Sequence, residues 1–146
     1  MPFDMDRSLG FVLNKTALLS KSRFSERIKR FGISPEQWSL IFRVVERAGL
    51  TQKELSDSTY KDQANITRSI ERLEKKGFVR KVQGERDRRA FHLYPTEKAL
   101  SLVEAIVPIS TTFNRHLTQG FTEQEREMLL QLLHKIHTNL ESEETL

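Results

Sequence analysis

The chain of 146 residues contains no cysteine. Disulfide bonds, thiolate metal sites and thiol redox sensing are therefore excluded, and a reducing cell interior is permitted. No apolar stretch approaches the roughly 20 residues that a membrane helix needs. The first ten residues include Asp4 and Asp6, and no signal-type apolar run follows them. We expect a soluble, cytoplasmic protein with no membrane partner.

The sequence also lacks the motifs that common classes of enzyme carry. No glycine-rich phosphate loop, HExxH or GxSxG segment occurs, and the serines and histidines show no spacing typical of a catalytic triad. His134 and His137 stand three residues apart, with His92 and His116 elsewhere. Two imidazoles without a third placed ligand favour surface histidines over a zinc site. We expect no enzyme activity, no cofactor and no metal.

No internal repeat, low-complexity tract or Gly/Ser linker divides the chain, which predicts a single domain over residues 1–146. Apolar residues recur at helical spacing through most of it. The helix just before the hairpin is expected from about Asp62 to Gly77, where glycine suits a left-handed C-cap. Capping boxes are predicted at Ser34/Gln37, Thr51/Glu54 and Thr122/Glu125. The predicted order of elements is α-α-α-α-β-β-α-α.

Positive charge is concentrated in residues 75–89, which hold seven basic and two acidic side chains in a chain of net charge +4. The apolar pair Phe78-Val79, the turn at Gly84 and the apolar run 90–94 predict a β-hairpin with a basic tip. Such a surface suits phosphate, because neutralising phosphates releases condensed counterions.

Two short helices joined by a tight turn and followed by a basic hairpin form a winged helix-turn-helix, whose second helix enters the major groove of DNA. Its outward face carries side chains of the kinds that read base edges or contact phosphate. These candidates are Gln63, Asn65, Thr67, Arg68 and Arg72. The candidates at the wing tip are Arg86, Asp87, Arg88 and Arg89. Arginine suits the narrow minor groove, and Asp87 is expected to fix one arginine in position.

Residues 51–99 resemble the winged core of the MarR family of bacterial transcription regulators. The resemblance rests on the ITRSIERLEKKGFV ending of the second helix, on the Asp-x-Arg pattern at Asp87–Arg89, and on Tyr-Pro-Thr-Glu-Lys leading into the next helix. The flanking helices, including the segment Gly32–Trp38, fit as well, so the resemblance covers nearly the whole chain.

The resemblance implies a mainly α fold and an obligate homodimer that binds a pseudo-palindromic operator in double-stranded DNA and usually represses. The implied winged core spans about 34–95, with the helix-turn-helix at about 51–76, the wing at about 78–94, and dimerisation helices at about 6–31 and 96–142. By the family's pattern, Arg89 enters the minor groove and Asp87 braces it.

The family also implies a pocket for a small aromatic or anionic effector between the dimerisation helices and the winged core. Candidates for its lining are Leu13, Lys15, Thr16, Trp38 and Phe42, although a tryptophan at helical spacing is more typical of a core. A different class stays open, since fold does not determine function. A winged-helix module can use its basic hairpin to bind an acidic protein surface without sequence-specific DNA binding.

Overall fold

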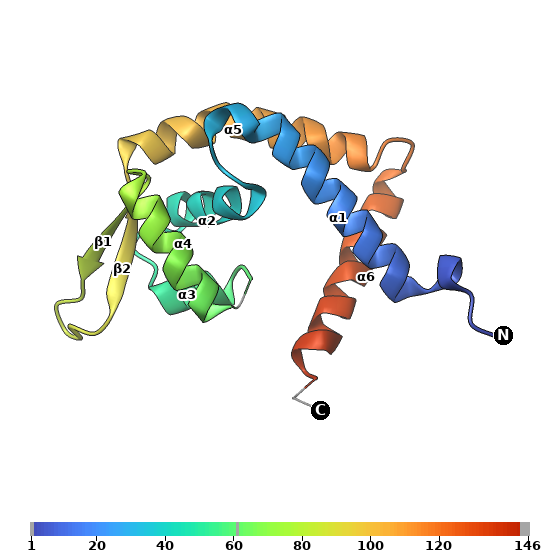
Figure 1. Ribbon diagram of the computed structural model, residues 1–146, viewed down its shortest axis with the longest axis horizontal. Helices are drawn as coiled ribbons and strands as arrows, with labels where there is room; N and C mark the ends of the chain where they lie inside the picture. The colour runs from blue at the N-terminus through green and yellow to red at the C-terminus, as the bar shows by residue number, and fades with distance from the viewer. Residues whose placement is uncertain (1, 61, 144–146) are drawn as a thin grey trace. The chain divides into compact units, whose positions relative to one another are not determined.

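The computed structural model describes residues 2–60 and 62–143, and its elements follow the predicted order (Figure 1). Short 3-10 turns precede and follow the first helix. The elements are η1 (Met5–Arg7), α1 (Leu9–Ile28), η2 (Lys29–Phe31), α2 (Pro35–Glu46), α3 (Gln52–Asp57), α4 (Gln63–Lys75), β1 (Val79–Gln83), β2 (Phe91–Pro95), α5 (Glu97–Leu117) and α6 (Glu123–Glu141). The predicted fold class, mainly α with a two-stranded wing, is confirmed.

The chain divides into two compact units, one ending at Ser110 and the other beginning at Thr111. The first unit holds α1 to α4, the hairpin and most of α5. The second holds the end of α5 and all of α6. α5 runs through the division without a break. The single domain predicted over residues 1–146 and its internal boundaries stay predictions.

Local capping explains where the helices begin. At α2 the Ser34 hydroxyl accepts from the Gln37 amide at 3.2 Å, and the Gln37 side chain accepts from the Ser34 amide at 3.0 Å. Thr122 and Glu125 repeat this box at α6. At α3 only half of the predicted box forms, because the Glu54 carboxylate accepts from the Thr51 hydroxyl at 3.1 Å. Thr51 also makes a β-bridge with His92, so its backbone follows strand geometry.

The core of the first unit is built from the inward stripes of its helices and from Val79 and Leu93 of the wing. The most deeply buried of these side chains are Ile28, Leu40, Ile41, Val44, Leu55, Ile66, Ile70, Leu73, Leu93 and Ile106. Leu93 on β2 is fully buried, and its backbone bonds Gly49 and Leu50 at 2.8 and 2.9 Å. The hairpin is therefore held to the helices both by apolar burial and by backbone hydrogen bonds.

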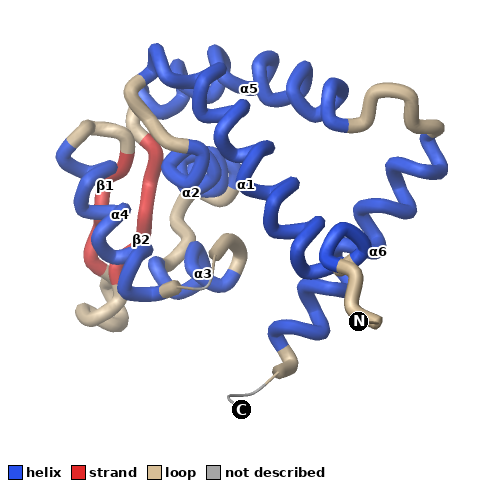
Figure 2. The backbone as a smooth tube through the Cα atoms, turned by 45° about the vertical axis from the view of Figure 1, so that its right-hand side comes forward, coloured by secondary structure: helices blue, strands red, loops and turns tan. Residues whose placement is uncertain are grey.

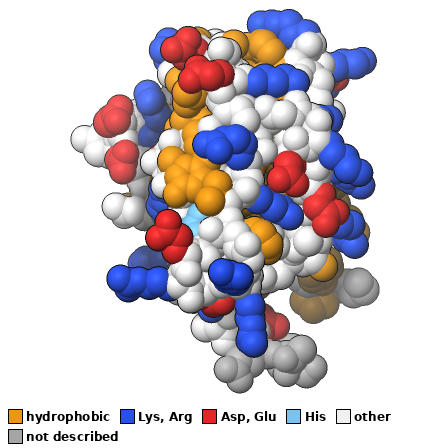
Figure 3. All heavy atoms as spheres, turned by 90° about the vertical axis from the view of Figure 1, so that its left-hand side faces the viewer, with side chains coloured by type: hydrophobic (Ala, Val, Ile, Leu, Met, Phe, Trp, Pro, Cys, Tyr) orange, Lys and Arg blue, Asp and Glu red, His pale blue; other side chains and the backbone are white. Residues whose placement is uncertain are grey.

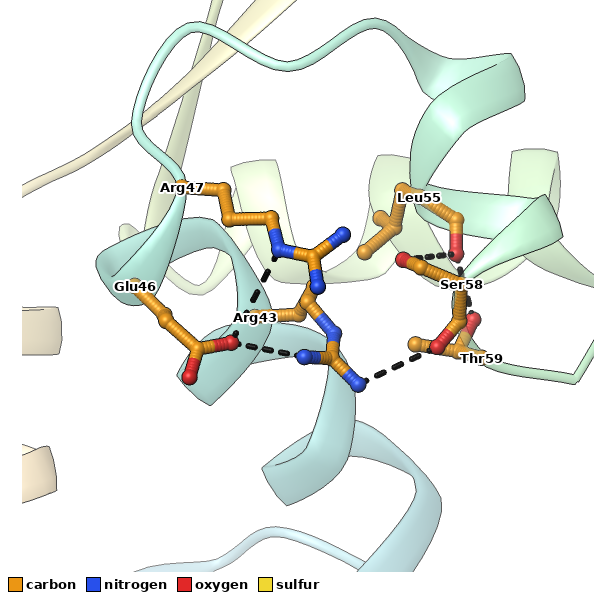
Figure 4. Close-up of polar contacts among 6 residues, drawn as sticks. All are labelled: Arg43, Glu46, Arg47, Leu55, Ser58 and Thr59. Atoms are coloured by element: carbon orange, nitrogen blue, oxygen red, sulfur yellow. Dashed lines mark hydrogen bonds and ion pairs between the residues drawn. The ribbon is translucent and has the colours of Figure 1, made fainter. Parts of the chain in front are cut away.

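Arg43 on α2 holds the turn of the helix-turn-helix (Figure 4). Its Nη2 donates to the Ser58 carbonyl at 3.1 Å, and its Nη1 lies 2.6 Å from Glu46. The last carbonyls of a helix have no partner within the helix, so Arg43 satisfies one of them at the end of α3. The Tyr60 hydroxyl donates to Ser39 Oγ, also on α2, at 2.9 Å. These bonds place the chain that leads into α4.

The terminal helices expose apolar side chains. On α1, Leu9 is 65% exposed and Leu18 is 60% exposed. On α6 no described residue is buried. Its exposed apolar residues are Met128, Leu129, Leu130, Leu132, Leu133 and Leu140. Among residues 2–60 and 62–143, no helix is both long enough and apolar enough to cross a membrane.

Candidate nucleic-acid interface

The second helix of the helix-turn-helix and the hairpin lie next to each other. α4 packs against β1, and both views of the backbone show it beside the strands (Figures 1 and 2). Figure 3 shows the face that carries the hairpin, where Lys and Arg side chains, with some acidic ones between them, surround an exposed apolar patch. This arrangement places a polar helix face and a cationic hairpin in one unit.

Three polar side chains at the start of α4 form a connected chain of hydrogen bonds. Asp62 caps the helix by accepting from the Asn65 amide N–H at 3.2 Å, and its other oxygen accepts from Asn65 Nδ2 at 2.6 Å. Asn65 Oδ1 in turn accepts from Arg68 Nη2 at 2.5 Å. All three residues are exposed. The sequence-predicted residues Asn65 and Arg68 are therefore brought together, with Asp62 as a partner that sequence reasoning missed.

Thr67 is also engaged within the protein. Its hydroxyl donates to the Gln63 carbonyl at 2.9 Å and accepts from Gln52 Nε2, at the start of α3, at 2.6 Å. The second bond ties α3 to α4. Gln52 lies 15 residues earlier in the sequence, and only the helix-turn-helix geometry brings it to Thr67.

Gln63 and Arg72, the remaining candidates on α4, differ from these residues. Both are exposed. Within the described residues, neither side chain has a hydrogen bond or an ion pair. Their side chains are free to contact a partner that approaches this face of the helix.

The wing tip is a tight turn built by the backbone around Asp87. The Gly84 amide donates to the Ala90 carbonyl at 2.9 Å, and the Ala90 amide donates to the Asp87 carbonyl at 3.1 Å. The Asp87 carboxylate accepts from the Arg89 backbone amide at 3.0 Å. The expected bracing of Arg89 by Asp87 is therefore made to its backbone. Gln83 Nε2 adds a bond to the Arg88 carbonyl at 2.7 Å.

The arginine side chains at the tip are exposed. Arg86, Arg88 and Arg89 carry no ion pair within the described residues, and Asp87 beside them is exposed too. Unpaired guanidinium groups on a structured turn are well placed for bidentate contacts with phosphate oxygens. The turn fixes the backbone from which these arginines extend, and the negative charge of a polyanion can attract their guanidinium groups.

Along the strands of the wing, basic side chains lie over aromatic rings. The Arg80 guanidinium is 5.9 Å from the centroid of the Tyr94 ring, and Lys81 Nζ is 5.6 Å from that of Phe91. These cation–π contacts restrain the basic side chains. They leave the tip as the part of the wing with free cations.

The effector candidates lie on two helices. Trp38 is 8% exposed and belongs to the core of the first unit, with its ring centroid 5.5 Å from that of Phe42 on the same helix. Leu13, Lys15 and Thr16 lie in the N-terminal half of α1, where Lys15 Nζ is 5.1 Å from the Phe11 ring centroid. The effector pocket stays a prediction.

Further along α1, an ion pair joins it to the start of α2. Lys21 Nζ contacts Glu36 Oε1. The hydrogen bond to Glu36 raises the pKa of Lys21. Partial burial raises the pKa of Glu36, but the hydrogen bond and charge of Lys21 outweigh it, and the pKa of Glu36 lies below its ordinary value. The pair therefore stays charged at neutral pH.

Two of the four histidines have polar partners. His92 Nδ1 lies 2.8 Å from the Gly49 carbonyl, and His137 Nδ1 lies 2.6 Å from Glu141 Oε1. In the part of the chain that the structure describes, no group of three or more histidine or carboxylate side chains is placed to hold a metal ion.

Comparison with known proteins gives a second line of support for the resemblance to the MarR family. The family model described as "MarR family" matches residues 31–90, which include α2 to α4 and β1. An uncharacterized HTH-type transcriptional regulator of Bacillus subtilis, YybA, is 28% identical over 142 residues, which are 94% of this chain and 89% of that protein. The chain is therefore similar to MarR-family regulators over most of its length.

Solved structures agree with this similarity. A putative MarR family transcriptional regulator from Listeria monocytogenes, in complex with a 26mer DNA, superposes with a TM-score of 0.85 at 28% identity. The match covers 92% of this chain and 89% of that one. BpsR of Bordetella bronchiseptica superposes with a TM-score of 0.87 over 94% of this chain and 98% of its own, at 21% identity, which shows the shared fold.

Sequence reasoning missed two residues of this candidate interface for different reasons. Asp62 had a local signal, because an aspartate just before a helix is a typical N-cap. Its second bond to Asn65 follows from the i, i+3 spacing on a helix. Gln52 had no such signal, because its contact with Thr67 crosses between two helices.

Proposed function

We propose that this MarR-family transcriptional regulator binds a pseudo-palindromic DNA operator as a homodimer and represses the genes beside it. In this proposal α4 lies in the major groove and the arginine tip of the wing lies against the minor groove and backbone. The observation that carries the proposal is the adjacency, within one unit, of a polar exposed helix face and a hairpin whose tip bears three unpaired arginines.

The DNA-bound Listeria relative supports the choice of partner, since that protein was crystallised with a 26mer duplex and is 28% identical to this chain. The division of labour between the two elements follows from chemistry. Phosphate contacts supply affinity without sequence information, and base-edge contacts supply specificity. The wing tip is rich in charge, whereas α4 offers the amide and guanidinium groups that distinguish base pairs.

The homodimer is supported by the exposed apolar residues of the terminal helices. Leu9 and Leu18 on α1 and the leucines of α6 would leave an apolar surface in water if the chain stayed monomeric, and such surfaces commonly mark protein interfaces. Two copies of α4 would then reach half-sites about one helical turn, roughly 10 bp, apart.

A small aromatic or anionic effector belongs to the same proposal. BpsR, which shares this fold, has its DNA binding regulated by 6-hydroxynicotinic acid. In this chain, the basic Lys15 and the aromatic Trp38 and Phe42 are the side chains that suit such a ligand. Release of DNA by an effector would follow if the ligand bound one arrangement of the dimer better than the other.

Arg89→Ala tests the assignment of the wing. We expect it to weaken operator binding by about 1–3 kcal/mol, the value of one good base-edge contact, and to leave dimerisation unchanged, because Arg89 is exposed at the tip. Lys135→Ala on α6 removes one positive charge from an element outside the wing and should bind like the native protein. Fluorescence anisotropy with an operator selected from genomic DNA measures both. Native affinity of Arg89→Ala would contradict the wing assignment.

Salt dependence separates DNA recognition from the alternative of a protein-binding winged helix. Each phosphate neutralised should contribute about −0.9 to the slope of log affinity against log salt concentration. A steep slope with a preferred sequence supports the operator. A flat salt response, or the absence of a preferred sequence in a selection from random DNA, would favour an acidic protein partner.

A further inference from the structure

We infer that Asn65 positions Arg68 for guanine and does not itself read a base, so that α4 reads sequence mainly through Gln63 and Arg68. The inference rests on the proposed function, because it requires α4 to lie in the major groove. It divides the five candidates on α4 by role: two base readers, one positioning residue and one residue that ties α4 to α3. For the fifth, Arg72, one turn beyond Arg68, the expected contact is a phosphate.

The orientation of the Asn65 amide follows from its two partners. The Asp62 carboxylate can only accept a hydrogen bond, and the Arg68 guanidinium can only donate one. Asn65 must therefore point Nδ2 at Asp62, at 2.6 Å, and Oδ1 at Arg68, at 2.5 Å. The reverse orientation would set donor against donor and acceptor against acceptor.

The same two groups are the ones that an asparagine needs for adenine. Its oxygen must accept from adenine N6 and its nitrogen must donate to N7. Asn65 still has a second N–H and a second oxygen lone pair, but turning its amide edge fully toward adenine would give up both intramolecular bonds. Each of those bonds involves a charged group, and charge-assisted hydrogen bonds are roughly twice as strong as neutral ones. The exchange is therefore unfavourable for Asn65.

Arg68 keeps what it needs for guanine. A guanidinium has five N–H donors, and only one contact to Asn65 is made within the described residues. The remaining donors can form the bidentate contact with O6 and N7. Asn65 restrains the long side chain before DNA arrives, which lowers the conformational entropy lost on binding. Thr67 is unsuited to reading through its hydroxyl, because that group already bonds Gln52 and the Gln63 carbonyl.

Base preference, measured position by position, tests the inference. The full-length protein and its variants are each subjected to selection from random DNA, followed by affinity titration on single-base operator variants. Arg68→Ala should lose the preference for one guanine by about 5- to 150-fold. Asn65→Ala should lower the preference at that same guanine by about 3- to 10-fold, the net value of one hydrogen bond. It should leave every adenine preference unchanged.

Asn65→Asp separates positioning from reading. An aspartate still accepts from Arg68 but cannot donate to adenine N7. The inference therefore expects Asn65→Asp to retain the guanine preference, with affinity lowered uniformly across sequences by the added negative charge. If Asn65→Ala and Asn65→Asp both abolish an adenine preference at a position distinct from that guanine, Asn65 is a reader and the inference is overturned.

The outcomes also distinguish this inference from the proposed function. If Arg68→Ala and Arg89→Ala both leave operator binding intact, α4 and the wing are not the interface, and both proposals fail. If Arg68→Ala removes a guanine preference while the Asn65 variants behave as base readers, only the inference fails. Unchanged circular dichroism of the variants confirms folding, since Asp62 still caps α4 through the Asn65 backbone amide.

Discussion

At the scale of single residues, Gly84 determines the shape of the wing tip. A Cβ at this position would lie 2.6 Å from the Asp87 carbonyl oxygen and 3.3 Å from that of Ala90. Both neighbours are backbone atoms of the same turn, so neither can move away as a flexible side chain would. The close approach lets the Gly84 amide bond Ala90 and keeps the turn tight.

Gly84→Ala is expected to open this turn and weaken operator binding. Forcing a methyl group into a filled space costs about 1–3 kcal/mol, and opening the turn displaces the arginines that follow. Glu85→Ala is the matched control, because it changes a neighbouring exposed residue without a backbone clash and removes a charge that repels phosphate. Titration with operator DNA should show weaker binding for Gly84→Ala and equal or tighter binding for Glu85→Ala. Native affinity of Gly84→Ala would show that the tip does not need this turn.

At the scale of secondary-structure elements, the position of α4 depends on how α3 and the turn are held to α2. Arg43 and Ser39, both on α2, bond Ser58 and Tyr60, which lie in the turn. Gln52 then connects the start of α3 to Thr67 on α4. α4 is therefore held by a polar contact from α3, by the bonds from α2 to the turn that precedes it, and by its own buried apolar stripe.

Arg43→Met tests the contribution of α2. Methionine keeps much of the aliphatic packing but leaves the Ser58 carbonyl without its donor. We expect the free energy of unfolding to fall by about 1–3 kcal/mol, the cost of an unsatisfied acceptor. Arg47→Met is the control, because Arg47 is exposed and meets Glu46 only at 3.9 Å, and exposed ion pairs contribute about 0–1 kcal/mol. Urea denaturation followed by circular dichroism compares the two. Equal stability of both variants would contradict a contribution of the Arg43–Ser58 hydrogen bond to the free energy of unfolding.

The elements differ in how well the sequence predicts them. Ser34 and Thr122 form the predicted capping boxes because every atom involved lies within four consecutive residues. Thr51 has the same local pattern and similar backbone angles, yet its box is half formed, because the Glu54 carboxylate accepts from the Thr51 hydroxyl. The local pattern therefore predicts the cap but not which donor the glutamate takes.

At the scale of the whole molecule, the apolar stripe of α6 predicts self-association. Leu129, Leu132, Leu133 and Leu140 recur at helical spacing and are exposed in the single chain. Burying apolar surface contributes about 25 cal/mol per Å². A dimer in which a second copy covers these side chains would therefore be more stable than the separate chains.

Leu133→Lys is expected to convert the proposed dimer into a monomer and to reduce operator affinity, because a charge would have to be buried in the proposed interface. Glu127→Lys places the same side chain on the opposite face of α6 and should remain dimeric. Size-exclusion chromatography with light scattering measures the mass of each variant, and circular dichroism tests whether it is folded. A dimeric Leu133→Lys would contradict a role for this stripe in the interface.

The sequence by itself determined the order of the elements, the fold class, the caps at Ser34 and Thr122, and the concentration of basic residues around the wing. These features depend on residues a few positions apart, whose spacing is set by the geometry of helices and turns. The resemblance to the MarR family rests on the same local motifs. The candidate residues at the wing tip and on α4 were found in this way, because exposed polar side chains on a short helix can be recognised from periodicity.

Only the tertiary structure decided what those side chains do in the free protein. It engages the Thr67 hydroxyl with Gln52 and joins Arg43 to Ser58, contacts that each span 15 residues. It also directs Asp87 to the backbone of Arg89. The physical reason is that a hydrogen bond depends on the position and orientation of both partners, and for distant residues these are set by packing of the buried core.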